Sequence, residues 1–202
     1  MRHLIVLVCL LYFYSSCSND DDSSAQDNKE LVIQNLQGEW TSDQVVEFNI
    51  PIPNPNFEVV YQTEVFTFNG QSNQLVNTSY ADRELTIPLL RYVSNGPFEI
   101  LRESLLFEDT WEADFANTSQ SVELLTDDAA FIELFGFQDC GVTTPNVIYP
   151  INEGCSIFPS VDDCIERDII QITDGNLRFG TRTADICTQR VTTLQTVVYT
   201  QN

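Results

Sequence analysis

Histidine is almost missing from this chain of 202 residues, and basic residues are scarce. The only histidine is His3, and 9 Lys and Arg stand against 30 Asp and Glu, which gives a formal net charge of −21. Because no histidine follows position 3, Ser-His-Asp and Cys-His catalysis and every histidine-containing zinc or iron site are excluded. The negative charge argues against nucleic acid as a partner and against charge-driven binding to anionic lipids, so we expect no nucleic acid partner.

Long apolar runs are also missing, since a membrane-spanning helix needs about 20 apolar residues. The apolar run over 4–14 has the length of the hydrophobic region of a signal peptide and follows one positive charge at Arg2. Two small residues then precede Cys17, and the chain becomes polar and acidic directly after it. This pattern resembles a bacterial lipoprotein signal, which implies that residues 1–16 are removed and that acyl chains on Cys17 attach the protein to a membrane.

The acidic residues after Cys17 also resemble the export signal of surface lipoproteins of the Bacteroidota type. This resemblance implies a lipid-anchored protein of the bacterial outer membrane, exposed at the cell surface, with the periplasmic face as the alternative. Residues 17–30 contain no apolar side chain larger than Ala25, which predicts an acidic flexible tether. Residues 31–202 are enough for one domain with a sizeable core.

Four cysteines remain in the exported part of the chain, and an even number there predicts two disulfides. No Cys-x₂₋₄-Cys spacing supports a zinc site in their place. If Gly175-Asn176 forms a two-residue turn, Cys164 falls opposite Cys187, although this register also places the like charges of Glu166 and Asp185 opposite each other. The rival turn, Asp174-Gly175, places two arginines opposite each other, at positions 167 and 182. We therefore favour Cys164–Cys187 together with Cys140–Cys155, and the two other connectivities stay open.

Short apolar and β-branched runs separated by turn residues predict an all-β domain. One segment differs: Thr126 is suited to cap a helix, apolar residues follow at helical spacing, and Gly136 stands where a helix ends. We expect one short helix there. The strand candidates are 45–50, 59–66, 85–93, 98–107, 111–115, 122–124, 165–173, 177–182 and 191–200.

A Gly-x-Trp motif, Gly38 to Trp40, stands at the head of the first strand and resembles the start of lipocalin-like (calycin) barrels. The C-terminal segment from Arg190 to Thr200 resembles the closing strand of lipocalin-like lipoproteins of the Bacteroidota type. The resemblance implies an antiparallel β-barrel whose closed end is plugged by Trp40, with Arg190, or else Arg182, packed over the indole. A β-sandwich is the alternative.

No nucleophile, acid–base, metal or cofactor motif stands out in the sequence. We therefore expect that the protein is not an enzyme and that it binds no cofactor or metal. We expect a binding protein that takes a small hydrophobic ligand inside the barrel, lined by Phe66, Phe68, Phe107, Phe115 and Phe179. The alternative is a surface module that binds glycan or protein. Its exposed stacking residues would be drawn from Tyr61, Tyr80, Tyr92 and Trp111.

Overall fold

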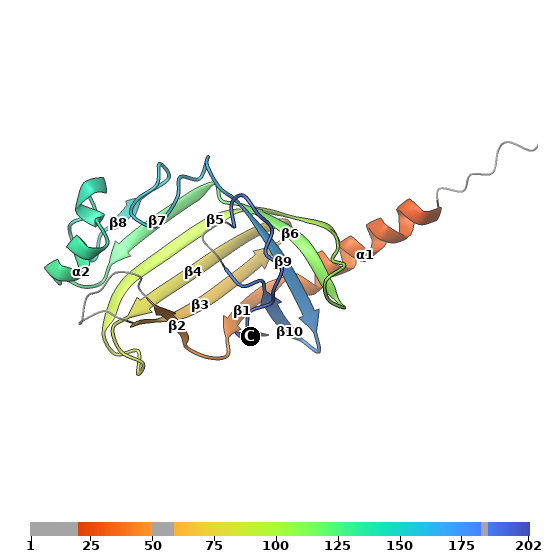
Figure 1. Cartoon of the computed structure of the whole chain (residues 1–202), viewed down its shortest axis with the longest axis horizontal. Helices are drawn as coiled ribbons and strands as arrows, with labels where there is room; N and C mark the ends of the chain where they lie inside the picture. Colours follow the sequence, from red (N-terminus) through yellow and green to blue (C-terminus); the bar gives the residue numbers. More distant parts are fainter. Residues whose placement is uncertain (1–19, 50–58, 183–185) are drawn as a thin grey trace, which may run out of the picture.

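The computed structural model describes residues 20–49, 59–182 and 186–202 and is shown in Figure 1. The signal peptide, Cys17 and the loop over 50–58 therefore lie outside the described residues. None of the helices described is long and apolar enough to cross a membrane. The elements are α1 (Asp20–Leu36), β1 (Gly38–Ser42), β2 (Val46–Asn49), β3 (Val59–Asn69), β4 (Ser72–Tyr80), β5 (Pro88–Glu103), β6 (Thr110–Ala116), β7 (Ser119–Leu124), α2 (Ala129–Leu134), the 3₁₀ helix η1 (Phe137–Cys140), β8 (Ile148–Pro150), β9 (Ile165–Thr173), β10 (Asn176–Phe179) and β11 (Tyr199–Gln201).

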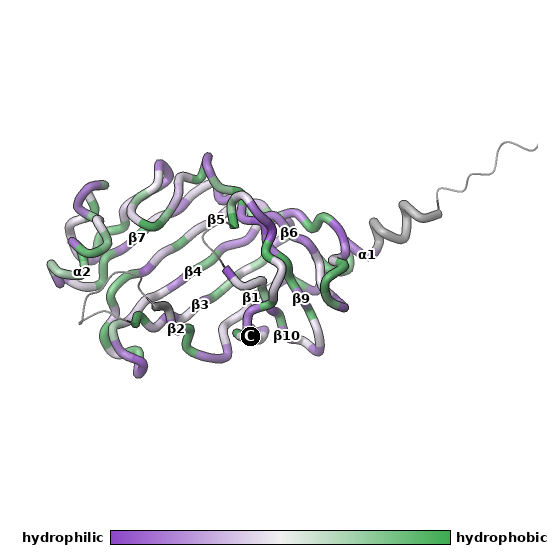
Figure 2. The backbone as a smooth tube through the Cα atoms, in the orientation of Figure 1, coloured by the Kyte–Doolittle hydropathy of each residue, from purple (hydrophilic) through white to green (hydrophobic). Residues whose placement is uncertain are grey.

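Eight strands close an antiparallel barrel in the order β1, β3, β4, β5, β6, β9, β10 and β11, and β11 pairs back with β1. The all-β barrel predicted from the sequence is therefore confirmed. Hydrophobic and hydrophilic segments alternate along the strands in Figure 2. This alternation places every second side chain in the interior.

Two long strands extend beyond the barrel into a second sheet region, which we call the wing. β5 has 16 residues, and it pairs with β6 over 98–103 and with β7 over 90–95. In the same way β3 pairs with β1 over 65–68 and with β2 over 59–62. The wing thus consists of β2, β7, β8 and the parts of β3, β4 and β5 between them.

Each region has its own hydrophobic cluster. The barrel cluster contains Trp40 and five buried phenylalanines, and the wing cluster packs β5 and β7 against α2 and η1. Tyr92 on β5 contacts both clusters. The helix-bearing insert therefore acts as a cover that buries the inner face of the wing.

Helix α1 corrects the prediction of a flexible tether, because the chain is already helical from Asp20. Val32 and Leu36 lie four residues apart and bury against the barrel, with exposed fractions of 8% and 0%. Packing of this C-terminal end against the barrel fixes the last turns of α1, and good helix formers such as Lys29 and Glu30 continue the helix toward its N-terminus. Only the docked end carries an apolar signal, which is why composition alone predicted a coil.

The short helix after the wing is confirmed, although it begins later than predicted. Asp128, not Thr126, is its N-cap, and the carboxylate accepts from the backbone N–H of Ala130 and Phe131 at 2.8 and 3.2 Å. Gly136 adopts a left-handed conformation with φ of 64°, as expected for a residue that ends a helix.

Both predicted disulfides are present, with Cα–Cα distances of 5.7 Å for Cys140–Cys155 and 4.8 Å for Cys164–Cys187. The strand register behind the second prediction is wrong, however. β9 and β10 pair Asn176 with Thr173, so the turn is Asp174-Gly175, with φ values of 54° and 75°. The ladder ends at Phe179, so the two arginines never face each other across it, and a loop brings Cys187 back to Cys164.

Some strand boundaries also differ from the prediction. The two candidates over 85–93 and 98–107 are one continuous strand, β5, and the candidate over 191–200 contributes only the short β11. Phe107 was expected inside the barrel but is 39% exposed in the loop between β5 and β6. β4 and β8 were not predicted, since β4 has few apolar residues and β8 has three residues.

Candidate functional site

Aromatic rings fill the apolar part of the barrel. Phe66 lies with its ring centroid 4.3 Å from that of Phe179 and 5.3 Å from that of Tyr199. The ring centroids of Phe68 and Phe98 are 5.2 Å apart, and both side chains are buried. Of the predicted lining residues, Phe66, Phe68, Phe115 and Phe179 thus point inward and Phe107 does not. The inward rings occupy the space that a hydrophobic ligand would need.

A polar layer follows on the same inner face. Glu64 on β3 accepts hydrogen bonds from the Tyr199 hydroxyl and, at 3.2 Å, from the Asn77 amide. Burial and then the adjacent Glu64 carboxylate raise the pKa of Tyr199 well above its ordinary value. The phenol therefore stays protonated and remains a hydrogen-bond donor to Glu64.

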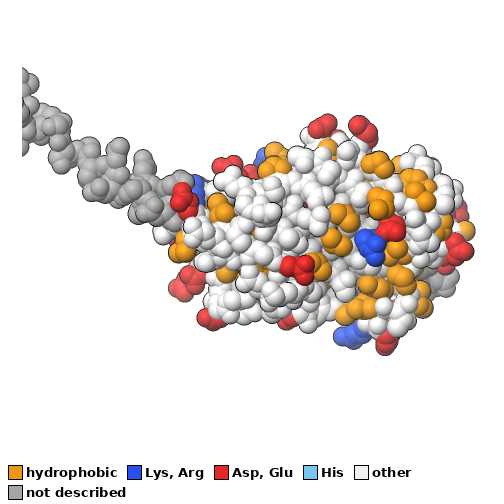
Figure 3. All heavy atoms as spheres, turned by 180° about the vertical axis from the view of Figure 1, so that it is seen from behind, with side chains coloured by type: hydrophobic (Ala, Val, Ile, Leu, Met, Phe, Trp, Pro, Cys, Tyr) orange, Lys and Arg blue, Asp and Glu red, His pale blue; other side chains and the backbone are white. Residues whose placement is uncertain are grey.

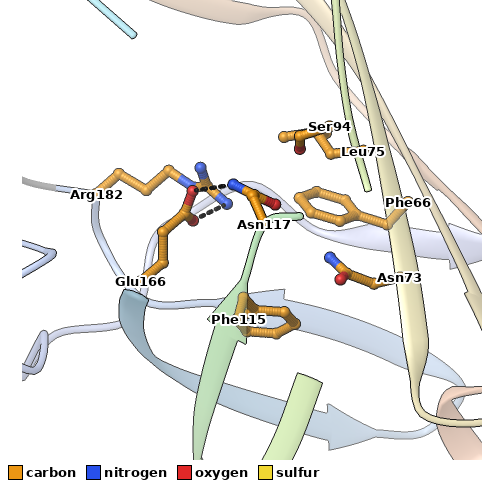
Figure 4. Close-up of a pocket in the computed structure, with 8 residues that line it drawn as sticks. All are labelled: Phe66, Asn73, Leu75, Ser94, Phe115, Asn117, Glu166 and Arg182. Carbon is orange, nitrogen blue, oxygen red and sulfur yellow. Dashed lines mark hydrogen bonds and ion pairs between the residues drawn. The ribbon is translucent and has the colours of Figure 1, made fainter. Parts of the chain in front are cut away.

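Next to this layer lies a small cavity of about 10 Å³, which we call the polar pocket. Figure 4 shows its side chains pointing toward one another from several strands of the barrel. The volume is close to that of one water-sized group. Its lining residues are Phe66, Asn73, Leu75, Ser94, Phe115, Asn117, Glu166 and Arg182.

Asn73 is the least satisfied group in the pocket. It lies on the inward face of β4, its exposed fraction is 7%, and its Oδ1 has no hydrogen-bond partner. A buried polar group left without a partner costs about 1–3 kcal/mol. The pocket therefore holds an open acceptor that a donor from outside the protein can satisfy.

Arg182 closes the pocket on the side of the solvent. Its guanidinium lies 3.2 Å from the Glu166 carboxylate and 6.0 Å from the centroid of the Phe66 ring. Desolvation lowers the pKa of Arg182, but the combined effect of the surrounding acidic groups, with Glu166 the largest and Glu64 next, outweighs it and raises the pKa overall. Because 38% of the Arg182 side chain is exposed, the pocket reaches solvent beside it.

Asp168 is a buried carboxyl group close enough to Arg182 and Glu166 for their charges to act on it. Its exposed fraction is 0%; Oδ1 accepts from the backbone N–H of Ile169 at 2.7 Å and of Gly180 at 2.8 Å, whereas Oδ2 has no partner. Burial raises the pKa of Asp168 to about 6, against the opposing charge of Arg182. Asp168 therefore titrates near neutral pH without contact with solvent.

The predicted barrel plug is assembled only in part. Trp40 is buried in the barrel, and the preceding Gly38 has a φ of 112°. Arg190, however, lies elsewhere: it pairs with Glu112 at 3.3 Å and with Asp114 at 2.5 Å. The reserve candidate, Arg182, contacts Phe66 and not the indole. The prediction of an arginine over Trp40 is wrong, because acidic side chains on β6 attract Arg190.

The proposed stacking residues are also dispersed. Tyr61 and Tyr80 lie opposite each other on the outer face of β3 and β4, where both are half-buried. Tyr92 points inward, stacks on Phe158 at 4.4 Å, and its burial raises its pKa to about 12. Trp111 packs against the barrel cluster. Only the two tyrosines on the outer face remain as a pair for stacking.

Asn73 and Asp168 were not predicted as site residues from the sequence, and Arg182 was expected only as a reserve plug. A signal was present in β4, where polar residues alternate at 73, 77 and 79 on the inward face, with Leu75 between them. Polar residues on the inward face of a barrel strand favour a polar site over a wholly apolar interior. Among the described residues, no group of three or more His, Cys, Asp or Glu is placed to hold a metal ion.

Comparison with known proteins gives no family for the chain. No family model matches the sequence, and no curated protein is significantly similar to it.

Proposed function

We propose that the protein is a lipid-anchored binding protein of the bacterial outer membrane, without catalytic activity, and that it takes a polar group of its ligand into the polar pocket. The observation that carries this proposal is Asn73, whose buried carbonyl oxygen faces the pocket without a partner. An open acceptor of this kind gains a hydrogen bond when a ligand supplies a donor.

The packing supports a polar ligand better than the hydrophobic ligand that the sequence favoured. Phe66 and Phe115 both contact Phe179 across the barrel, and all three rings are almost fully buried. An eight-stranded barrel has an interior just wide enough for its own side chains to fill. A carrier of apolar molecules would need that space to be open.

The carboxylates around the pocket support a binding role over hydrolysis. A glycoside hydrolase needs two carboxyl groups that face each other across the substrate. Here Glu64 is engaged by Tyr199 and Asn77, and Glu166 is engaged by Arg182. Asp168 has no exposed surface with which to meet a substrate.

Attachment to the membrane is supported by the sequence around Cys17, with its signal-like apolar run and acidic continuation. Helix α1 then leads from this region to the barrel, where Leu36 is fully buried. Membership of the lipocalin-like lipoproteins remains a prediction from the Gly-x-Trp motif and the C-terminal segment.

A thermal-shift screen of the detergent-solubilised protein against polar metabolites and oligosaccharides tests this function. Asn73→Leu removes the open acceptor, and Gln74→Ala is the matched control, because Gln74 is the next residue on β4 and is exposed on the other face. We expect ligands that stabilise the wild type and Gln74→Ala but not Asn73→Leu. A ligand response that is identical in all three proteins contradicts a site at the polar pocket.

A further inference from the structure

The charges around the polar pocket restrict what it can bind. The guanidinium of Arg182 is already paired with Glu166, and the Glu64 carboxylate acts on it as well. The pocket lining thus holds one carboxylate, Glu166, and one guanidinium, Arg182, and the further carboxylates of Glu64 and Asp168 act on Arg182 from nearby. Acidic side chains also outnumber basic ones on the face shown in Figure 3, on a protein whose net charge is −21. The carboxylates would repel an anionic group, and the guanidinium of Arg182 would repel a cationic group. This electrostatic arrangement favours a neutral group.

The hydrogen-bonding groups restrict the ligand further. Asn73 Oδ1 needs a donor, and the nearby Ser94 hydroxyl can both donate and accept. The Asn117 amide, also in the pocket, lies 3.5 Å from Glu166, at the outer limit of a hydrogen bond. A hydroxyl group both donates and accepts and is about as large as the water-sized space of about 10 Å³.

Aromatic rings form the remaining wall. Phe66 and Phe115 line the same pocket from β3 and β6, and both point into it in Figure 4. A ring face offers an apolar surface to C–H groups that stand beside a hydroxyl. Hydroxyl groups on a carbon skeleton, with alternating polar and apolar edges, are the chemistry of sugars and polyols.

We infer that the polar pocket, in the binding role proposed above, binds a neutral, hydroxyl-rich group such as a sugar ring or a linear polyol, with one hydroxyl donating to Asn73. The inference rests on the proposed function and adds the chemical class of the ligand. A free sugar and the end of a glycan chain present the same hydroxyl chemistry, so the experiment includes both.

A charge-matched series of probes tests the inference on the full chain in detergent. The probes are galactose, galacturonic acid and galactosamine, the corresponding glucose set, mannitol, oligosaccharides ending in galactose or glucose, and decanoate as an apolar probe. Saturation-transfer NMR detects contact, and titration calorimetry gives the affinity. The proteins are the wild type, Asn73→Leu and Gln74→Ala, each first shown to be folded by circular dichroism and a cooperative thermal transition.

We expect at least one neutral probe to bind the wild type and Gln74→Ala about tenfold more tightly than its uronate or amino counterpart, and Asn73→Leu to lose about tenfold in affinity for it. Stronger binding of the oligosaccharide than of the free sugar identifies a glycan end as the source. Tighter binding of the uronate, the amino sugar or decanoate, or no binding of any probe, overturns the inference. The proposed function is overturned separately, by a metabolite screen in which Asn73→Leu responds as the wild type does.

If Asn73→Leu does not fold, Ser94→Ala takes its place, because Ser94 lines the same pocket and alanine is compatible with a strand. The same loss of affinity for the neutral probe is then expected. An unchanged affinity in a folded Ser94→Ala protein counts against a hydroxyl bound in this pocket.

Discussion

Trp40 donates its indole N–H to the backbone carbonyl of Leu36 at 2.7 Å, which ties the last turn of α1 to the interior of the barrel. Both side chains are almost fully buried, with exposed fractions of 1% and 0%. The Gly-x-Trp motif is thus used to join the helix to the barrel, and not to hold an arginine.

Replacing this tryptophan should destabilise the protein strongly. We expect Trp40→Ala to lower the free energy of unfolding by about 3–5 kcal/mol, because a large buried ring is removed. Trp40→Phe keeps much of the packing but loses the hydrogen bond to Leu36, and should cost less. Urea unfolding followed by circular dichroism measures both, with Tyr61→Ala on the outer face as the control. A loss below about 1 kcal/mol for Trp40→Ala would place the indole outside the core.

Asp168 should make stability depend on pH. Its pKa is about 6 in the folded protein and about 3.9 in an unfolded chain, so between these values the folded state binds more protons. Stability due to this group is therefore present at low pH and is lost as the pH rises from about 4 to about 6, by about 3 kcal/mol.

The variant Asp168→Asn isolates this effect, since it keeps an oxygen for the N–H groups of Ile169 and Gly180. We expect its stability relative to the wild type to increase by a few kcal/mol between pH 4 and pH 7. Unfolding curves across this range measure the difference, with Asp114→Asn as a partly exposed comparison. A constant difference across the range contradicts a raised pKa.

Gly96 should tolerate no side chain. A Cβ at this position would lie 1.9 Å from the backbone oxygen of Ala116, where the connection between β6 and β7 passes close to β5. We expect Gly96→Ala to cost about 1–3 kcal/mol, as overpacking does, or more because backbone must move. Gly175→Ala is the control, since its Cβ meets nothing within 4 Å and only the φ of 75° is unfavourable. If thermal unfolding shows equal losses of stability for the two variants, the backbone does not approach Gly96 this closely.

The disulfide between Cys164 and Cys187 should contribute measurably to stability. The two residues are 23 apart in sequence, and closing a loop of this size is worth about 3 kcal/mol on the chain-entropy account. The double variant Cys164→Ser, Cys187→Ser should lose that amount in urea unfolding. Non-reducing peptide mapping checks the pairing, and a peptide joining Cys155 to Cys164 would refute it.

Cys17 should control membrane attachment. We expect the wild type to fractionate with membranes and to incorporate labelled palmitate, and Cys17→Ala to accumulate unprocessed or in the soluble fraction. Cys140→Ser is the comparison, because it removes a cysteine of the folded domain without touching the signal. A Cys17→Ala protein that is still processed and membrane-bound would rule out lipidation at this residue.

The fold class followed from local patterns, because alternation and turn residues act over a few positions. The disulfide between Cys164 and Cys187 was also predicted, but from a strand register that is wrong. The apolar inward positions of Phe66, Phe68, Phe115 and Phe179 were identifiable by alternation alone, and Gly136 by its place after an apolar stripe. Each of these signals is contained in one short segment.

The register and the site did not follow, because they depend on partners far apart in sequence. The unfavourable pairing of Arg167 with Arg182, which argued against the turn at Asp174-Gly175, does not form, because the ladder between β9 and β10 ends at Phe179. Arg190 is drawn to Glu112 and Asp114 by contacts across 76 or more positions. The polar pocket, likewise, brings together side chains that are spread along the sequence from Phe66 to Arg182.

The continuity of β5 through barrel and wing has a consequence for how the protein unfolds. Phe98 and Ile100 belong to the barrel cluster, and Leu89 and Leu90 to the wing cluster, on one uninterrupted strand. Because the two cores share this strand, melting of one core removes packing partners from the other, so we expect the two cores to unfold together. The amides of β5 should therefore exchange with solvent only when the whole molecule unfolds in a single cooperative step.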